Sequence, residues 1–179
     1  YDATLGYGGH SERMLERLFG QGHLYATDAD PLELEKTRSR LAALGYGPEI
    51  FTPRLLNFEH VDLVAPGSHF NFALADLGVS SMQLDNPQRG FTFKHDGPLD
   101  LRLNPTTGTP AAQRLQELSR DELWGMLMEN ADEPYAEQIA TAVTGHIKGG
   151  HPIATNVQLP AVVGWARTFL PVPYTTLTI

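Results

Sequence analysis

The sequence predicts an α/β fold, and three observations carry this prediction. Short apolar runs alternate with helical patterns along residues 1–76, which is typical of βαβ units in a parallel sheet. The chain opens on a glycine-rich turn at residues 6–9, and an acid, Asp28, follows twenty positions after Gly8. The pattern becomes helical over residues 110–169. We therefore expect a Rossmann-like sheet with an inserted helical subdomain.

Caps and apolar spacing set the elements of the first half. Asp30-Pro31 is expected to open a helix, because Asp is a favoured N-cap and Pro fits the first helical position. Leu34, Leu41 and Leu44 give that helix an apolar stripe. The other expected elements are a helix at 11–19, a strand at 23–27 ending at Asp28, a strand at 50–55 and a buried strand at 70–75 ending at Asp76.

The second half is expected to begin with an ordered, functional loop at residues 77–109, since loops of this length are otherwise uncommon in compact domains. Helices follow, and Trp124 and Trp165 lie on helical stripes that predict core positions. Residues 172–179 offer at most one further strand. The expected helix starts are Thr109-Pro110, a capping box of Ser119 with Glu122, Glu133-Pro134 and Thr155.

Composition excludes several classes of protein. The 179 residues contain no cysteine, which excludes a disulfide framework, a thiolate metal site and a thiol nucleophile. No apolar run approaches the length of a membrane span. The formal net charge of −8 argues against a general nucleic-acid coat, since phosphate binding needs clustered Lys and Arg. A locally basic stretch still occurs, with Arg89, Lys94, His95 and Arg102.

The glycine turn and the acid after it indicate a ligand site. Glycines let a backbone approach a ligand closely, and an acid about twenty residues on is placed to accept hydrogen bonds from ribose hydroxyls. Gly6, Gly8 and Gly9 do not follow the spacing of the dinucleotide fingerprint, so an S-adenosylmethionine (SAM) site fits them better. The alternatives are a plain surface turn for the glycines and a helix-approach role for Asp28.

Three further side chains have both a functional and a structural interpretation. Asp76 ends the fourth strand, where an acceptor could hold the hydrogens of an exocyclic base amine; alternatively, it caps the loop that follows. His10 is either a general base or ligand contact, or a helix cap. Phe58 either stacks on an adenine or belongs to the core, and the residues alone favour the core.

One segment is more particular than composition explains. It reads Asp76-Leu-Gly-Val-Ser-Ser-Met-Gln-Leu-Asp85, then Arg89-Gly-Phe-Thr-Phe, then Asp96-Gly-Pro-Leu-Asp-Leu-Arg102. Together with the opening Asp2-Ala-Thr-Leu-Gly-Tyr-Gly-Gly-His-Ser11 and with Thr27-Asp-Ala-Asp-Pro31, it resembles the RsmH (MraW) family, which are SAM-dependent methyltransferases of small-subunit ribosomal RNA. The clear resemblance covers about residues 1–105, and a weaker helical one continues to about residue 169.

The resemblance implies a SAM-dependent methyltransferase fold that methylates N4 of a cytidine in the ribosomal decoding centre. Small-subunit ribosomal RNA or the assembled small subunit would be the partner, in a bacterial cytoplasm or an organelle, and no metal is implied. Asp76 would be the catalytic residue. The residues implied to bind SAM are Gly8, Gly9, His10, Asp28, Phe58, Asp76 and Gln83. The residues implied to shape the target-base pocket are Arg89, Phe91, Asp96, Asp100 and Arg102.

Some features depart from the family. Residues 131–140 lack the basic charge that the family carries there, which motivates another RNA or a small molecule as an alternative substrate. Fewer strands are found than a methyltransferase sheet needs, so we expect a chain that is incomplete at both ends, or a non-catalytic SAM-binding or assembly protein. The expected domains are a core at 1–105 with a substrate loop at 77–105, a helical insertion at 106–170 and a tail at 171–179 that returns to the core.

Overall fold

The structure is a computed structural model, and it describes residues 1–67 and 69–167. The chain forms two compact units, Tyr1–Met82 and Gln83–Ile179, each with its own apolar core. Most of the loop predicted at 77–105 therefore lies in the second unit with the helices. The predicted tail at 171–179 lies outside the described residues.

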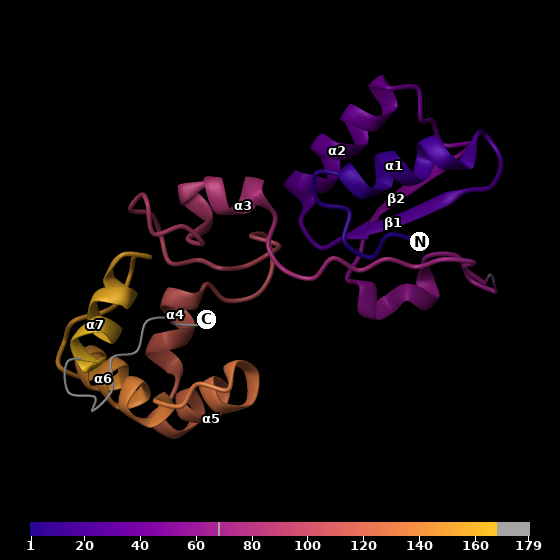
Figure 1. Cartoon of the computed structure of the whole chain (residues 1–179). Coiled ribbons are helices and arrows are strands. Elements are labelled where there is room, and N and C mark those ends of the chain that lie inside the picture. The colour runs from indigo at the N-terminus through magenta and orange to yellow at the C-terminus, as the bar shows by residue number, and fades with distance from the viewer. Residues whose placement is uncertain (68, 168–179) are drawn as a thin grey trace. The chain divides into compact units, whose positions relative to one another are not determined.

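The first unit is built on a parallel sheet (Figure 1). Strand β1 (Leu24–Asp28) pairs with β2 (Phe51–Leu55). On the other side of β1, Asp2 forms parallel bridges to both Ala26 and Leu74. The four parallel segments thus lie in the order β2, β1, the chain start and the segment at Leu74. This is the 3-2-1-4 order of doubly wound sheets, which bind ligands where the order reverses.

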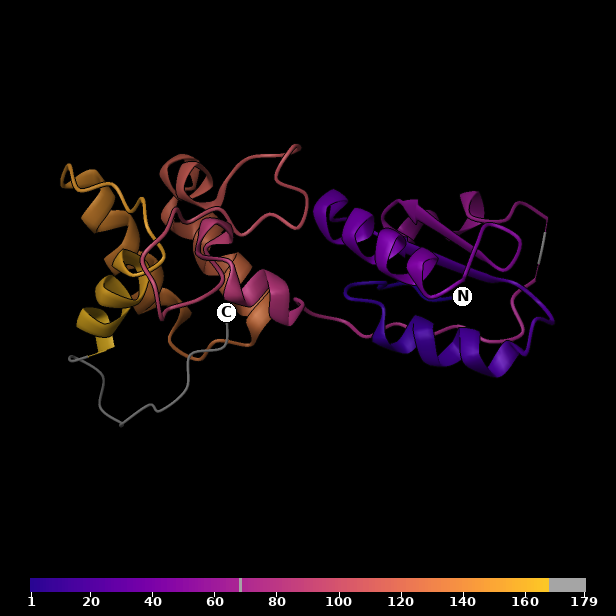
Figure 2. The same cartoon turned by 90° about the horizontal axis from the view of Figure 1, so that it is seen from above.

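Two helices cover one face of this sheet (Figure 1, and from above in Figure 2). Helix α1 (Gly9–Leu18) and helix α2 (Pro31–Ala43) pack their apolar sides on the strands. Asp30 caps α2 as predicted, with its carboxylate accepting the N–H of Leu32. Leu44 is not part of the buried stripe; it is 54% exposed because α2 ends one residue earlier. The shared core comprises Leu5, Leu15, Leu24, Ala26, Leu41 and Phe51.

The prediction of a buried strand at residues 70–75 is wrong. Only Leu74 forms a bridge, and Phe72 is 60% exposed. The segment pairs with the irregular chain start, where the Ala3 N–H donates to the Leu74 carbonyl, and no bridge is formed on its other side among the described residues. A segment that pairs with only one irregular neighbour leaves most of its backbone and side chains exposed. Asp76, which follows, is exposed as well.

The second unit is helical. Helix α5 (Arg120–Ala131) starts at the predicted capping box, in which Ser119 and Glu122 bond each other's backbone N–H. Helix α6 (Ala136–Lys148) packs on both α5 and α7 (Gln158–Arg167) around an apolar core that includes Leu123, Ile139 and Val143. The shorter elements of the chain are the 3-10 helices η1 (Phe58–Leu63) and η2 (Pro87–Arg89) and the helices α3 (Ser81–Asp85) and α4 (Ala111–Glu117).

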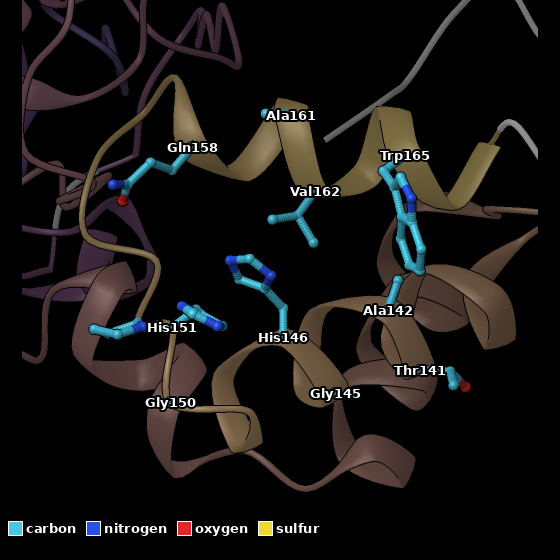
Figure 3. Close-up of a pocket in the computed structure, with 11 residues that line it drawn as sticks. Thr141, Ala142, Gly145, His146, Gly150, His151, Gln158, Ala161, Val162 and Trp165 are labelled. Carbon is cyan, nitrogen blue, oxygen red and sulfur yellow. The ribbon is translucent and has the colours of Figure 1, made fainter.

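Two predictions on tryptophan are wrong. Trp124 is 45% exposed and Trp165 is 63% exposed. Trp124 lies one position beyond Leu123, which faces the core, and Trp165 borders an open groove between α6 and α7 (Figure 3). Among the described residues, no helix is long and apolar enough to cross a membrane.

Two predicted helix caps are also wrong. Pro110, not Thr109, holds the N-cap position of α4, and no side chain caps that helix. Helix α7 begins three residues after Thr155, and the Gln158 side-chain oxygen instead accepts the N–H groups of Ala154 and Thr155. At α4, the first N–H groups donate to backbone carbonyls instead, Ala111 to Asp100 and Ala112 to Leu99.

Candidate functional site

The glycine turn follows the first parallel segment of the sheet. Gly6 and Gly8 adopt left-handed backbone angles, with φ of +48° and +80°. The Leu5 N–H donates to the Thr27 carbonyl of β1, which ties the turn to the strand end. Gly8 is the N-cap of α1, so the turn leads directly into the N-terminus of that helix. No atom lies within 4 Å of where a Cβ on Gly9 would stand, so the start of α1 is open to a ligand.

Helix α2 holds the turn from the side. Thr37 Oγ1 donates to the Gly6 carbonyl at 2.5 Å, and Arg40 Nη2 donates to the Tyr7 carbonyl at 2.8 Å. The Arg40 guanidinium also lies 4.3 Å from the centre of the Tyr7 ring. A Cβ on Gly8 would stand 2.5 Å from Thr37 Cγ2, so this close approach requires glycine. Sequence reasoning missed Thr37 and Arg40, although polar residues on the buried side of α2 were a signal.

Asp28 ends β1 beside the turn. Its Oδ2 accepts the Gly6 N–H at 2.7 Å, and its Oδ1 accepts the Asp30 N–H at 2.8 Å. Burial raises the pKa of this carboxyl, and the backbone donors oppose that shift only in part. A carboxylate has about four acceptor positions, so a donor from a ligand, such as a ribose hydroxyl, could still bind to it.

Two further carboxyl groups are buried around this edge. Asp2 accepts Ser11 Oγ–H at 2.7 Å and the Thr4 N–H at 3.1 Å. Glu33 on α2 accepts Ser80 Oγ–H at 3.3 Å. Burial raises the pKa of both carboxyls. Keeping these carboxyl groups ionised therefore costs free energy, and hydrogen-bond donors from a ligand would lower that cost.

Asp76 lies at the end of the fourth parallel segment. Its backbone N–H donates to Thr4 Oγ1 at 2.8 Å, which holds it against the first segment. His10 Nδ1, in the first turn of α1, lies 3.8 Å from Asp76 Oδ2, and both side chains are exposed. Phe58, in η1, is 44% exposed, so the core position that the residues alone favoured is wrong. The structure thus places the glycine turn, Asp28 and Asp76 after three adjacent parallel segments.

The remaining predicted residues belong to the second unit. Arg89 is buried, and its Nη2 donates to the carbonyls of Arg102 and Leu103 at 2.8 and 2.7 Å. Arg102 pairs with Asp100 at 2.6 Å, which holds the pKa of that carboxyl below its usual value. Gln83 is buried in α3. Phe91 is half-buried and Asp96 is exposed.

Asn156 fixes the loop that contains these residues, and sequence reasoning missed it. Its buried amide donates to the carbonyls of Thr92 and His95 and accepts the Gly97 N–H. A Cβ on Gly97 would stand 2.1 Å from the Pro87 carbonyl oxygen, so these two parts of the loop approach each other too closely for any residue but glycine at position 97. No sequence signal links Asn156 to residues about sixty positions earlier.

Comparisons with known proteins agree with one another. The family model described as the MraW methylase family matches residues 1–172. A protein of Agathobacter rectalis named ribosomal RNA small subunit methyltransferase H 1 is 57% identical over 172 residues, which are 96% of this chain and 49% of that protein. A protein of Alkaliphilus metalliredigens named ribosomal RNA small subunit methyltransferase H 2 is 56% identical over 171 residues, 95% of this chain and 49% of that protein. The chain spans about half the length of the curated relatives it matches.

Proposed function

The chain belongs to the MraW methylase family, and on that premise we propose that it is part of a SAM-dependent enzyme that methylates N4 of a cytidine in small-subunit ribosomal RNA. The substrate would be the ribosomal RNA or the assembled small subunit, in the cytoplasm. The observation that carries the proposal is the meeting of the glycine turn, Asp28 and Asp76 where the order of the parallel segments reverses.

The cofactor would be held by residues of this edge. Asp28 would accept the ribose hydroxyls, and the open start of α1 at Gly8, Gly9 and His10 would face the rest of SAM. Phe58 is exposed enough to lie against the adenine. Gln83 remains a proposed contact from the family resemblance. Bound SAM supplies a methyl group on a positively charged sulfur.

Catalysis would rest on position rather than on a covalent intermediate. The amine of cytosine is a weak nucleophile, because its lone pair is delocalised into the ring. Asp76 would accept a hydrogen of that amine and so orient the nitrogen toward the methyl group. His10, whose Nδ1 lies 3.8 Å from Asp76 Oδ2, would take the proton that the methylated amine releases. The chain has no cysteine to form an adduct with the base.

The loop of the second unit would shape the base pocket. A cytidine must leave its stack to reach the methyl group, and the exposed Phe93 and half-buried Phe91 offer rings for it. Asp96, Asp100 and Arg102 would line the pocket with polar groups. We propose further that residues 106–170 are an insertion into the sheet fold.

The test is methyl transfer by the full-length protein that contains this chain. Small subunits lacking the modification are incubated with labelled SAM, in parallel with other RNA and with free small molecules. We expect transfer to the subunit alone, and Asp76→Ala should lower the rate at saturating SAM by at least about tenfold, the loss of one oriented hydrogen bond. Asp62→Ala, which removes another exposed carboxylate of the first unit, is the control.

Three results would each overturn part of this proposal. Transfer to another RNA or a small molecule, and none to the subunit, would replace the substrate. SAM binding without transfer to anything offered would make the protein a non-catalytic binder. A near-normal rate in Asp76→Ala would leave the family activity in place and remove Asp76 from catalysis.

A further inference from the structure

Glu33 on α2 is a buried carboxylate that the proposed mechanism does not use. The residue is 3% exposed. It occupies the third position of the helix, from which a glutamate in a capping box reaches back to the N–H of the N-cap residue. Here that N–H belongs to Asp30 and donates to Asp28 Oδ1. The Glu33 carboxylate instead accepts the hydroxyl of Ser80, forty-seven positions later, at 3.3 Å.

Ser80 ends a short loop at residues 77–80, which we call the strap. At its start, the Asp76 N–H donates to Thr4 Oγ1, which fixes that end. At its other end, Ser80 Cβ lies 4.0 Å from where a Cβ on Gly6 would stand. The strap therefore runs from the carboxylate proposed to hold the target amine to the turn proposed to hold the cofactor.

The middle of the strap is held by little packing. Leu77 is 71% exposed and Val79 is 38% exposed. Gly78 has a φ of +134°, which residues with a side chain rarely adopt. A segment with few buried apolar contacts opens easily unless its ends are fixed. Because only four residues join the two ends, releasing the end at Ser80 would also let the end at Asp76 move.

The charge of Glu33 does not help the first unit to fold. Burial raises the pKa of this carboxyl, and the neighbouring Asp30 and Asp28 raise it as well, whereas Ser80 and Lys36 oppose the shift. Keeping a carboxylate ionised in such a place costs free energy. A neutral side chain at this position should therefore not lower the stability of the first unit, and this allows its role in the reaction to be tested separately.

We propose that Glu33 is a positioning residue for methyl transfer: through Ser80 it fixes the strap, and with it the direction of the Asp76 carboxylate. This rests on the proposed function, in which Asp76 accepts a hydrogen of the target amine. The effect belongs to the rate at saturation rather than to cofactor binding, because Asp28, the proposed ribose acceptor, is held by the N–H groups of Gly6 and Asp30.

The test measures methyl transfer by the full-length protein with Glu33→Ala, Glu33→Gln and a control, Glu35→Ala. Glu35 is an exposed acid of the same helix and pairs with Arg38. We expect Glu33→Ala to lower the rate at saturating SAM and RNA by about tenfold to a hundredfold, with SAM affinity changed by less than about threefold. Glu33→Gln should restore most of the rate, because its amide oxygen can accept the Ser80 hydroxyl. Glu35→Ala should keep both the rate and the affinity.

Ser80→Ala tests the bond itself. It should lower the rate as much as Glu33→Ala does, and the double variant should lose nothing further. Losses that add in the double variant would mean that the two side chains act separately, which overturns the proposal. An unchanged rate in Glu33→Ala overturns it too. So does a joint loss of melting temperature and SAM affinity that Glu33→Gln does not restore, since Glu33 would then be a structural residue only.

Amide hydrogen exchange gives a result that does not depend on methyl transfer. The Asp76 N–H should exchange faster in Glu33→Ala than in the unmodified protein or in Glu33→Gln. The N–H of Thr27 in β1, which donates to the Asp2 carbonyl, should exchange equally in all three and so report an intact sheet. Equal exchange at Asp76 in all three overturns the proposal. Absence of methyl transfer by the unmodified protein overturns the proposed function instead.

Discussion

The two units hold in different ways the loops in which the sequence predicted the site residues. In the first unit, the glycine turn is held by several small contacts, from Thr37, Arg40 and Asp28, each to a different backbone group. In the second unit, the long loop depends on two buried side chains, Arg89 and Asn156, and each bonds several backbone groups at once. We therefore expect a single substitution of Thr37 or Arg40 around the turn to lower SAM affinity only slightly. A single substitution of Arg89 or Asn156 should instead cause a large loss of stability in the second unit.

The largest expected effect follows removal of the Asn156 amide. Asn156→Ala leaves two carbonyls and one N–H without their partner, the Thr92 carbonyl in a buried place and the other two groups in partly buried places, and a buried group left unpaired costs roughly 1–3 kcal/mol. We expect the free energy of unfolding to fall by about 3 kcal/mol or more in chemical denaturation. Asn130→Ala, which removes one exposed hydrogen bond from a side-chain amide on α5, is the control. A loss no larger than that of the control would show that the loop does not depend on this amide.

Arg89 gives the next largest effect and separates two roles. As an internal support, it donates charge-assisted bonds worth about 1.5–3 kcal/mol, so Arg89→Ala should lower stability by that order. The salt dependence of RNA binding should not change in this variant. Lys94→Ala, which removes an exposed cation of the same loop, should keep stability and reduce the salt slope by about 0.7 if Lys94 contacts a phosphate. The reverse outcome, a flatter salt slope and normal stability for Arg89→Ala, would make Arg89 an RNA contact.

Asp28 gives a smaller effect with a characteristic pH dependence. Asp28→Asn should weaken SAM binding by about tenfold to a hundredfold in calorimetry, the loss of charge-assisted bonds. Ribose donors favour the ionised carboxylate, so the affinity of the unmodified protein should rise as pH increases through the raised pKa of Asp28. The affinity of Asp28→Asn should not depend on pH in that window. Asp62→Asn serves as the control.

In the absence of SAM, the contribution of Asp28 to stability should change with pH in the opposite direction to the SAM affinity. Burial raises the pKa of Asp28, so the native state holds its proton more tightly than the unfolded chain does. The contribution of Asp28 to stability is therefore present below the ordinary aspartate pKa and is lost as pH rises through the raised pKa. The stability difference between the unmodified protein and Asp28→Asn should follow this course. An unchanged difference across the window would mean that the carboxyl is better solvated than its burial indicates.

The smallest expected effect is that of Thr37→Val, which tests whether the turn tolerates the loss of one of its contacts. Thr37→Val keeps the shape of the side chain and removes its bond to the Gly6 carbonyl, worth about 1 kcal/mol. SAM affinity should fall by a few-fold, about what 1 kcal/mol gives, with the fold retained. Ser39→Ala on the exposed side of α2 should leave the affinity unchanged. A complete loss of SAM binding in Thr37→Val would mean that the turn, too, has a single essential support.

Local signals in the sequence predicted helix caps correctly, whereas features that depend on long-range packing were predicted wrongly. The cap at Asp30-Pro31 and the box of Ser119 with Glu122 are confirmed, because each is decided within a few residues. The family resemblance is confirmed as well, since it rested on motifs that the chain carries in order. The strand at 70–75 and the burial of Trp124 and Trp165 were wrong, because each depends on which neighbours cover the residue.

The candidate site shows the same division. The sequence placed Asp28 and Asp76 at strand ends, and the structure brings both to one edge of the sheet. It did not reveal Thr37 or Asn156, whose bonds join segments about thirty and sixty positions apart. The cofactor and base contacts drawn from the family stay predictions.

The order of the parallel segments also has a consequence for synthesis on the ribosome. Asp76 bonds back across seventy-two positions to Thr4, whereas the glycine turn is braced by Thr37 and Arg40. At about 5–20 residues per second, the chain from Arg40 to Asp76 takes roughly two to seven seconds to make. The part of the site that would hold the ribose is thus complete in the nascent chain seconds before the part that would hold the target amine. We expect SAM present during translation to bind and stabilise the growing chain before Asp76 is added.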